Sequence, residues 1–278
     1  MPMRVLIMAD MEGVSGIVHW DQVTNGAPMY QEGRRLYTEE INAAVRGARA
    51  GGATEIVVVD SHGAGAAGTM GGPAFNSIIP ELIDPDCEFV THHGWANYTE
   101  MLEQGCDACF FVGIHARGGT PGGVLSHTIA SGHWLEIRIN DVVVGEIGVV
   151  AALCGAHGVP MVLVTGDDKA CDEAKALLGP ELRTVAVKKG LSRFSARHIP
   201  PVRARAMIEK AARAALLEKS AAKIYTPRGP VTVSMDIVTA DLMDPYRRIA
   251  GIELVEPRTV ISRGADFMEA WRRVAPYK

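Results

Sequence analysis

The sequence contains neither a long run of one charge nor a long apolar stretch. Lysine and arginine number 28 against 32 aspartates and glutamates, and because no basic cluster stands out, no nucleic-acid partner is expected. No segment approaches the roughly 20 apolar residues that span a bilayer. The first apolar run reaches Asp10 too soon for a signal peptide, so we expect a cytoplasmic protein without membrane contact.

Disulfide and phosphate-binding patterns are lacking as well. The five cysteines have no framework spacing, and the one CxxC pair, Cys106 and Cys109, lies in an apolar segment that favours buried thiols over a metal or redox site. The glycine-rich stretches 61–72 and 116–127 match neither GxxxxGK followed by Ser or Thr nor GxGxxG between a strand and a helix. A nucleotide-binding protein is therefore disfavoured, and we interpret both stretches as loops that line a cleft.

What the sequence does contain is an alternation of apolar strands and helices. Hydrophobic residues make up 47% and charged residues 22% of the 278 residues, which is ordinary for a globular protein. Continuous apolar runs at 4–10, 55–60, 108–115 and 161–168 predict strands buried on both faces, and helices are expected at 30–52, 144–160, 167–179 and 201–223. The pattern predicts an α/β fold with a mainly parallel sheet flanked by helices.

The composition shifts near residues 226–230. Beyond this point, segments 231–238 and 253–263 predict antiparallel strands, and 266–274 predicts a short terminal helix. We therefore expect an α/β domain over residues 1–225. A small C-terminal α+β portion of strands and a helix, residues 226–278, is expected to pack on it.

Carboxylates and histidines gather where the predicted strands end or a helix begins. They are Asp10, Glu12, His62, His115, His127 and Glu146. Functional groups in open α/β sheets collect at the carboxyl ends of the strands, so these side chains are expected to share one cleft. Carboxylates can bridge two cations and neutral imidazoles can fill terminal positions on zinc, which makes this set suitable for a two-metal hydrolase. Asp10, nearest the strand end, is the better candidate for a bridge.

Each residue taken alone also has a structural explanation. A carboxylate after a strand is commonly a turn or N-cap residue, a lone histidine is more often a hydrogen-bonded structural residue, and Glu146 can complement a helix dipole. Asp60 either orients a ligating imidazole or caps the following loop. The pair His92 and His93 receives low weight. Surface or core positions are expected for the remaining histidines, which are His19, His133, His157 and His198.

The motifs, taken in order, resemble a known family. "ADMEGVSG", "VVDSHG", "GIHA", "GVLSHT" and "NDVVVGEIG", extended by "YTEEINAAVRGA", "VPMVLVTGDD" and "AVKKGLSR", are similar to the M55 zinc peptidases, the D-aminopeptidase family, over most of the chain. The resemblance implies two zinc ions (Zn2+) per subunit, bridged by Asp10 and completed by Glu12, His62, His115 and Glu146. It also implies a homo-oligomer, a ring-like decamer.

His127 of "SHT" matches the catalytic histidine of the family, which is usually described as a nucleophile. Because zinc lowers the pKa of bound water, that water is an alternative nucleophile. His127 would then donate a proton to the leaving amine or stabilise the oxyanion. Both interpretations leave His127 catalytic without being a primary ligand.

The leading hypothesis is a binuclear zinc aminopeptidase that removes the N-terminal residue, a D-amino acid if the resemblance extends to specificity, from short peptides. The alternatives are a metal-dependent amidase or esterase acting on another small substrate, and a non-catalytic metal-binding assembly module. The non-catalytic module predicts the loss of at least one metal ligand, yet all of them are present: Asp10, His62, His115 and Glu146. The loop at 63–72 is richer in Gly and Ala than the family leads us to expect, so D-specificity stays open.

Overall fold

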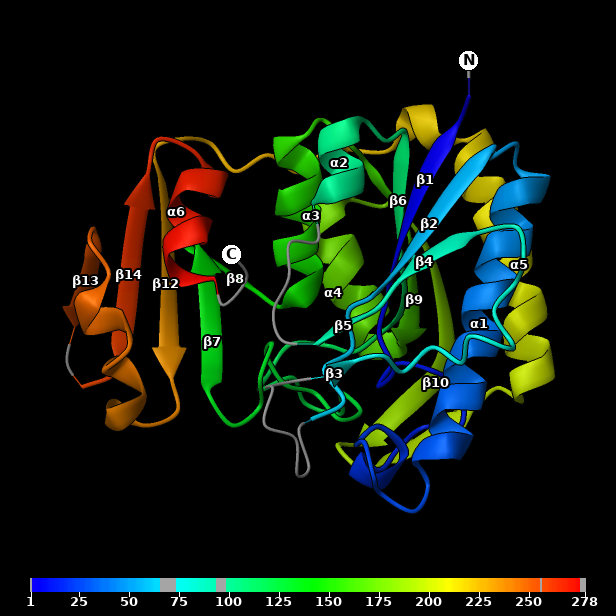
Figure 1. Cartoon of the computed structure of the whole chain (residues 1–278), viewed down its shortest axis with the longest axis horizontal. Helices are drawn as coiled ribbons and strands as arrows, with labels where there is room; N and C mark the ends of the chain where they lie inside the picture. Colours follow the sequence, from blue (N-terminus) through cyan, green and yellow to red (C-terminus); the bar gives the residue numbers. More distant parts are fainter. Residues whose placement is uncertain (1, 66–73, 94–98, 256, 276–278) are drawn as a thin grey trace.

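The computed structural model describes residues 2–65, 74–93, 99–255 and 257–275, which form a seven-stranded, a five-stranded and a two-stranded sheet (Figure 1). The largest has the order β11-β10-β9-β6-β1-β2-β4 and is parallel except for β11. Its strands are β1 (Arg4–Ala9), β2 (Glu55–Asp60), β4 (Glu88–Val90), β6 (Ala108–Ile114), β9 (Met161–Asp167), β10 (Arg183–Ser192) and β11 (Ser195–His198). The predicted α/β fold with a mainly parallel sheet is confirmed.

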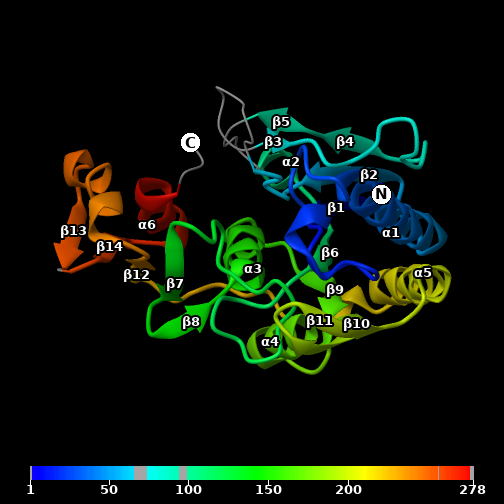
Figure 2. The same ribbon diagram turned by 90° about the horizontal axis from the view of Figure 1, so that it is seen from below.

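Helices cover both faces of this sheet, as Figures 1 and 2 show. On one face lie α1 (Tyr30–Ala50) and α5 (Pro201–Leu217), and on the other lie α3 (Glu146–Ala156) and α4 (Asp168–Leu178). The chain also forms the short helix α2 (Glu100–Gln104) and the 3-10 turns η1 (Trp20–Gln22), η2 (Lys219–Ala221), η3 (Ala240–Met243) and η4 (Tyr246–Arg248). The four longer helices correspond to those predicted, and α3 begins at Glu146 because Val144 belongs to a strand.

The second sheet is antiparallel and has the order β13-β14-β12-β7-β8. It consists of β7 (Trp134–Ile139), β8 (Val142–Val144), β12 (Val231–Ile237), β13 (Ile252–Val255) and β14 (Thr259–Gly264), with α6 (Phe267–Val274) packed beside it. The prediction of one strand over 253–263 is wrong, because a turn that includes Pro257 divides this segment into a hairpin. The small third sheet pairs β3 (Ala74–Phe75) with β5 (His92–His93).

One hydrophobic cluster joins the two large sheets. It includes Met8 of β1, Ile147 of α3, Val233 of β12 and Trp271 of α6, each at most 3% exposed. The division at residue 225 stays a prediction, and the second sheet unites strands from both sides of it. The C-terminal strands pair directly with β7, which comes from the middle of the chain.

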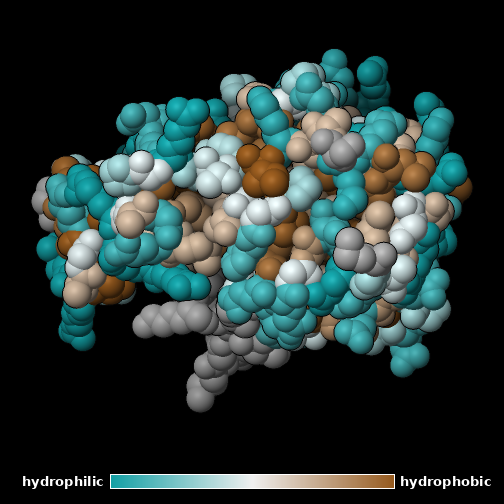
Figure 3. Space-filling view, turned by 90° about the horizontal axis from the view of Figure 1, so that it is seen from above, coloured by the Kyte–Doolittle hydropathy of each residue, from teal (hydrophilic) through white to brown (hydrophobic). Residues whose placement is uncertain are grey.

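The surface and the thiols are consistent with the composition. Seen from the amino ends of the parallel strands, hydrophilic residues surround small, separate apolar areas (Figure 3). Among the described residues, no helix combines the length and hydrophobicity needed to cross a bilayer. All five cysteines are free, and of the CxxC pair Cys109 is buried as predicted whereas Cys106 is half-buried.

The chain changes direction across the sheet between β1 and β6. From β1 it builds outward through β2 to β4, and from β6 it builds the other way through β9 to β10. Such a switch point opens a crevice beyond the carboxyl ends of the two strands, where ligands of α/β proteins bind. Asp10 follows β1 and His115 follows β6, so the two flank this crevice.

Two glycines allow the segments after β1 and β6 to touch. The Gly13 N–H donates to the Gly113 carbonyl at 2.7 Å, and a Cβ on Gly13 would lie 2.1 Å from the carbonyl oxygen of Ile114. Gly113 has a φ of +73°, and a Cβ there would lie 2.1 Å from the carbonyl oxygen of Asp10. Only glycine fits this contact without moving one of the two backbones.

Gly13→Ala is therefore expected to lower the free energy of unfolding by about 1–3 kcal/mol or more, since the new methyl group meets rigid backbone. Urea denaturation measures the change. Gly132→Ala is the matched control, because a Cβ on Gly132 meets no atom within 4 Å. Equal stability of both variants would show that the contact between the two segments is loose.

Candidate metal centre

All six residues singled out in the sequence lie together at the carboxyl ends of the main sheet. In chain order they are Asp10 and Glu12 after β1, His62 after β2, His115 after β6, His127 in the following loop, and Glu146 at the first position of α3. They form two groups of three, and within each group the ligand atoms lie within 4.8 Å of one another. The structure brings the whole set into one site.

The first group consists of Asp10, Glu12 and His62, each 3% exposed. Nε2 of His62 donates to the Val23 carbonyl at 2.7 Å, which leaves Nδ1 as the nitrogen that faces the carboxylates. Nδ1 lies 3.1 Å from Oδ1 of Asp10 and 3.0 Å from Oε2 of Glu12. One imidazole nitrogen and two carboxylate oxygens thus converge on one point.

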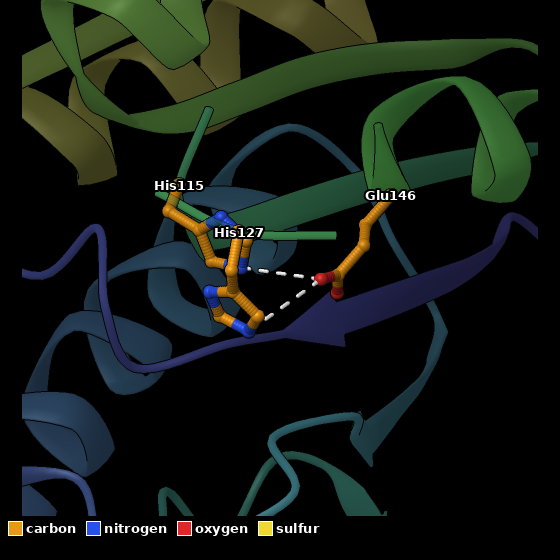
Figure 4. Close-up of side chains that lie close together, drawn as sticks. All are labelled: His115, His127 and Glu146. Atoms are coloured by element: carbon orange, nitrogen blue, oxygen red, sulfur yellow. Dashed lines mark ion pairs between the residues drawn. The ribbon is translucent and has the colours of Figure 1, made fainter. Parts of the chain in front are cut away.

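The second group consists of His115, His127 and Glu146 (Figure 4). Nε2 of His115 lies 3.2 Å from Oε1 of Glu146, and Nε2 of His127 lies 3.9 Å from the same oxygen. The two imidazole rings stack with centroids 4.0 Å apart. Each ring is oriented through Nδ1, which donates to a backbone carbonyl, that of Ala116 for His115 and that of Leu125 for His127.

Asp10 connects the two groups. Its Oδ1 faces His62, and its Oδ2 lies 3.5 Å from Nε2 of His115. Oδ2 of Asp10, Oε2 of Glu12 and Nε2 of His115 are buried without a hydrogen-bond partner. Buried polar atoms are normally satisfied, and three unsatisfied ligand atoms aimed at one site fit a metal cluster.

The charges of the first group are strongly coupled. Burial opposes the charged form of His62, but the carboxylates of Glu12 and Asp10 raise its pKa well above the usual value. Burial, reinforced by the charge of Glu12, raises the pKa of Asp10 to about 7. Burial would also raise the pKa of Glu12, but His62 holds it well below the usual value. Such perturbed groups in a buried cluster are typical of functional sites.

The surroundings of His127 favour a neutral imidazole. Burial, followed by the proximity of His115, lowers the pKa of His127 to about 4. The ring of Trp20 meets that of His127 edge to face at 5.6 Å between centroids. Glu146 is held in turn by the backbone N–H of Ile129, which donates to Oε1 at 2.9 Å.

Asp60 supports the loop and does not contact the imidazole of His62. Its Oδ1 accepts from the Tyr37 hydroxyl at 2.9 Å and from the backbone N–H of His62 at 3.2 Å. Its Oδ2 accepts from the backbone N–H groups of Ser77 and Ile78. The interpretation of Asp60 as an imidazole-orienting group is wrong, since Val23 fills that role, and the alternative of a loop cap is confirmed.

A cavity of about 780 Å³ opens beside both groups. Glu12, His62 and His127 are among the residues that line it. The other described lining residues are mainly apolar or small, with two tryptophans and a tyrosine among them; they are Trp20, Val23, Thr24, Gly63, Ala64, Gly65, Ile129, Ala130, Ser131, Gly132, His133, Trp134 and Tyr246. A cavity of this size suits a ligand of a few residues.

The cavity tests several smaller predictions. His133 is exposed, a surface position as expected, and it also lines the cavity. His92 stacks on Phe75 with centroids 4.3 Å apart and is absent from the described lining. Of the first glycine-rich stretch, positions 63–65 line the cavity as predicted, and 66–72 lie outside the described residues.

Sequence reasoning missed two buried charged residues that hold the loop after β1. Lys188 of β10 and Glu40 of α1 are each 1% exposed. Glu40 accepts from the Ser15 N–H at 3.0 Å, and burial raises its pKa to about 7. The only sequence signal for Lys188 is its place in the strand-like segment "TVAVKKG", where the side chain after Val187 points inward instead of into solvent.

Comparison with known proteins identifies the same family as the sequence motifs. Residues 3–275 match the peptidase M55 family, described as D-aminopeptidase. The D-aminopeptidase of Bacillus subtilis (strain 168) is 31% identical over 275 residues, covering 97% of this chain and 94% of the relative. The solved structure of the Zn-dependent D-aminopeptidase DppA from Bacillus subtilis, described as a self-compartmentalizing protease, matches with a TM-score of 0.85 and 30% identity over 97% of this chain and 95% of that chain.

Proposed function

Because this chain belongs to the peptidase M55 family of D-aminopeptidases, we propose that it is a binuclear zinc aminopeptidase that removes the N-terminal residue from short peptides. The observation that carries the proposal is the junction at Asp10, where two groups of potential ligands meet and three buried ligand atoms have no hydrogen-bond partner. The zinc dependence of the Bacillus subtilis enzyme supports the choice of metal.

We assign Asp10 as the ligand that two zinc ions would share. Glu12 and His62 would hold one ion, and His115 and Glu146 would hold the other. Support comes from the two oxygens of Asp10, one facing His62 and one facing His115. The ring nitrogens aimed at the carboxylates are Nδ1 of His62 and Nε2 of His115, and the opposite nitrogen of each ring is committed to a backbone carbonyl.

Zinc in such a site polarises the scissile carbonyl and acidifies a water molecule. His127 acts beside it as a proton carrier. Its Nδ1 donates to the Leu125 carbonyl, so Nε2 is the nitrogen that accepts a proton and passes it to the leaving amine. Trp20 packs edge to face against the His127 ring.

The substrate preference follows from the cavity. Its described lining carries no lysine or arginine, and Glu12 is the one carboxylate in it, so short peptides with small or apolar N-terminal residues fit better than charged ones. A panel of D-Ala, L-Ala, D-Phe and D-Lys dipeptides, each with and without N-acetylation, tests the function. We expect hydrolysis of unblocked peptides with neutral D-residues and no turnover of the acetylated forms.

Equal hydrolysis of acetylated peptides or simple esters would contradict an aminopeptidase and favour the amidase or esterase alternative. Absence of hydrolysis in a protein that carries two zinc ions would favour the non-catalytic metal-binding module. Chelation with subsequent zinc addition serves as the control, because it separates loss of the metal from loss of the fold.

We also propose that the chain acts as a homo-oligomer. The description of the Bacillus subtilis enzyme as self-compartmentalizing supports assembly, and a ring-like decamer is the form that we predict. The mass in solution by light scattering tests it, since a decamer of 29.7 kDa chains is easily distinguished from smaller states. The cytoplasmic location stays a prediction from the sequence.

A further inference from the structure

A buried lysine lies beneath the loop that carries Glu12. Lys188, in β10, is 1% exposed, although lysine is among the residues least often buried. Removing an ammonium group from water is unfavourable unless hydrogen bonds replace the lost hydration. The contacts of this ammonium group therefore indicate why the fold keeps it.

The ammonium group of Lys188 donates to three backbone carbonyls of one loop. Its Nζ reaches the carbonyl oxygens of Glu12, Val14 at 2.9 Å and Ile17 at 2.7 Å. An ammonium group has three donors, and all three are used on residues 12–17. The loop is thus folded around a single positive charge.

The ammonium group of Lys188 binds backbone carbonyls of the loop, and among the described residues it forms no ion pair. Within the described part of the chain, no carboxylate forms an ion pair with Lys188, although Asp167 and Glu40 lie close enough to influence it. Glu40 contacts the same loop by accepting from the Ser15 N–H. A lysine that served only to neutralise a buried acid would contact that acid directly.

The geometry of the loop determines where the Glu12 carboxylate lies. Glu12 is the one residue of segment 12–17 that belongs to the metal-ligand groups, and Lys188 binds its own backbone carbonyl. The side chain of Glu12 then reaches Nδ1 of His62 at 3.0 Å. A shift of the backbone at Glu12 moves this carboxylate directly, whereas His115 and Glu146 are carried by other elements.

We propose that Lys188 is the positioning residue of one half of the metal centre: its ammonium group fixes the backbone of the Glu12 loop so that the Glu12 carboxylate meets the same metal ion as His62. The proposal rests on the two-zinc site described under Proposed function. It predicts an asymmetric effect, because Lys188 contacts the loop of one ligand group and has no contact with the other.

The test is Lys188→Met, which keeps most of the side-chain volume and removes all three donors. Zinc binding to the full chain is measured by competition with a chelating dye, and the sites are also filled with Co²⁺ for absorption spectroscopy. One of the two zinc ions is expected to bind 10–100-fold more weakly, as is typical when a group that orients a ligand is removed. The other ion keeps its affinity, and the Co²⁺ bands of one site alone change.

Lys189→Met is the matched control, because the adjacent Lys189 side chain is exposed and should leave both affinities as in the wild type. Unchanged affinities in Lys188→Met, or equal weakening of both ions, would overturn the positioning role and leave the proposed function intact. If Lys188→Met does not fold, Lys188→Arg decides by the same criteria, since its planar fork cannot reproduce three converging bonds. A wild type that binds no zinc would overturn the zinc site and, with it, this proposal.

Discussion

Replacing Asp10 by alanine is expected to reduce the zinc content from two ions per subunit to one or none. The reason is that the two oxygens of Asp10 face the two ligand groups separately, so one substitution removes a ligand from both ions. We expect kcat/KM to fall by about 10³-fold or more, because the metal ions contribute several kcal/mol to catalysis. Elemental analysis of the purified variant, beside steady-state kinetics, measures both effects.

Asp60→Asn provides the control for that substitution. Asp60 is also a buried carboxylate at the end of a neighbouring strand, but its oxygens accept hydrogen bonds from Tyr37 and from loop backbone. The variant should keep two zinc ions and lose about 1–3 kcal/mol of stability, the usual result of leaving buried donors unsatisfied. Normal zinc content in Asp10→Ala would refute the shared-ligand assignment.

Replacing His127 by alanine is expected to lower kcat by about 10²- to 10⁴-fold and to leave two zinc ions bound, since proton transfer by a positioned side chain contributes in this range. His115→Ala makes the informative comparison. Its ring stacks on that of His127 with centroids 4.0 Å apart, so both variants open similar space, yet His115 is assigned as a ligand. We expect His115→Ala to lose zinc.

The same pair of variants distinguishes two roles of His127. Its Nε2 lies 3.9 Å from Oε1 of Glu146, within the group whose atoms could hold one metal ion. If His127→Ala loses zinc as His115→Ala does, His127 is a further ligand of that ion, beside Asp10, His115 and Glu146. If it keeps both zinc and full kcat, His127 has no part in proton transfer.

The site was predictable because strand ends can be read from the sequence. Asp10, His62 and His115 each follow a continuous apolar run, and parallel strands bring such ends to one edge of the sheet. Adjacency of β1 and β6 does not follow from these runs, because strand order depends on long-range pairing. The joint occurrence of acids and histidines compensated for that missing information.

Other parts of the structure gave no usable pattern in the sequence. β7 lies in the middle of the chain yet pairs with β12 near its end, and no local periodicity in the sequence indicates this partner. Asp60 showed the limit for single residues, since a carboxylate that caps a loop and one that orients an imidazole look alike in a sequence. Lys188 was missed because a lysine in an apolar strand is ordinarily expected to face solvent.

The second sheet combines strands from both sides of residue 225, so the chain cannot be divided there into two independent folding units. A fragment ending near residue 225 would contain β7 and β8 but lack β12, so β7 would expose an unpaired edge to other chains. The same cut would remove Tyr246, which lines the same cavity as Glu12 and His62. The C-terminal segment therefore contributes both to substrate preference and to solubility, and a substitution in its hairpins affects both properties.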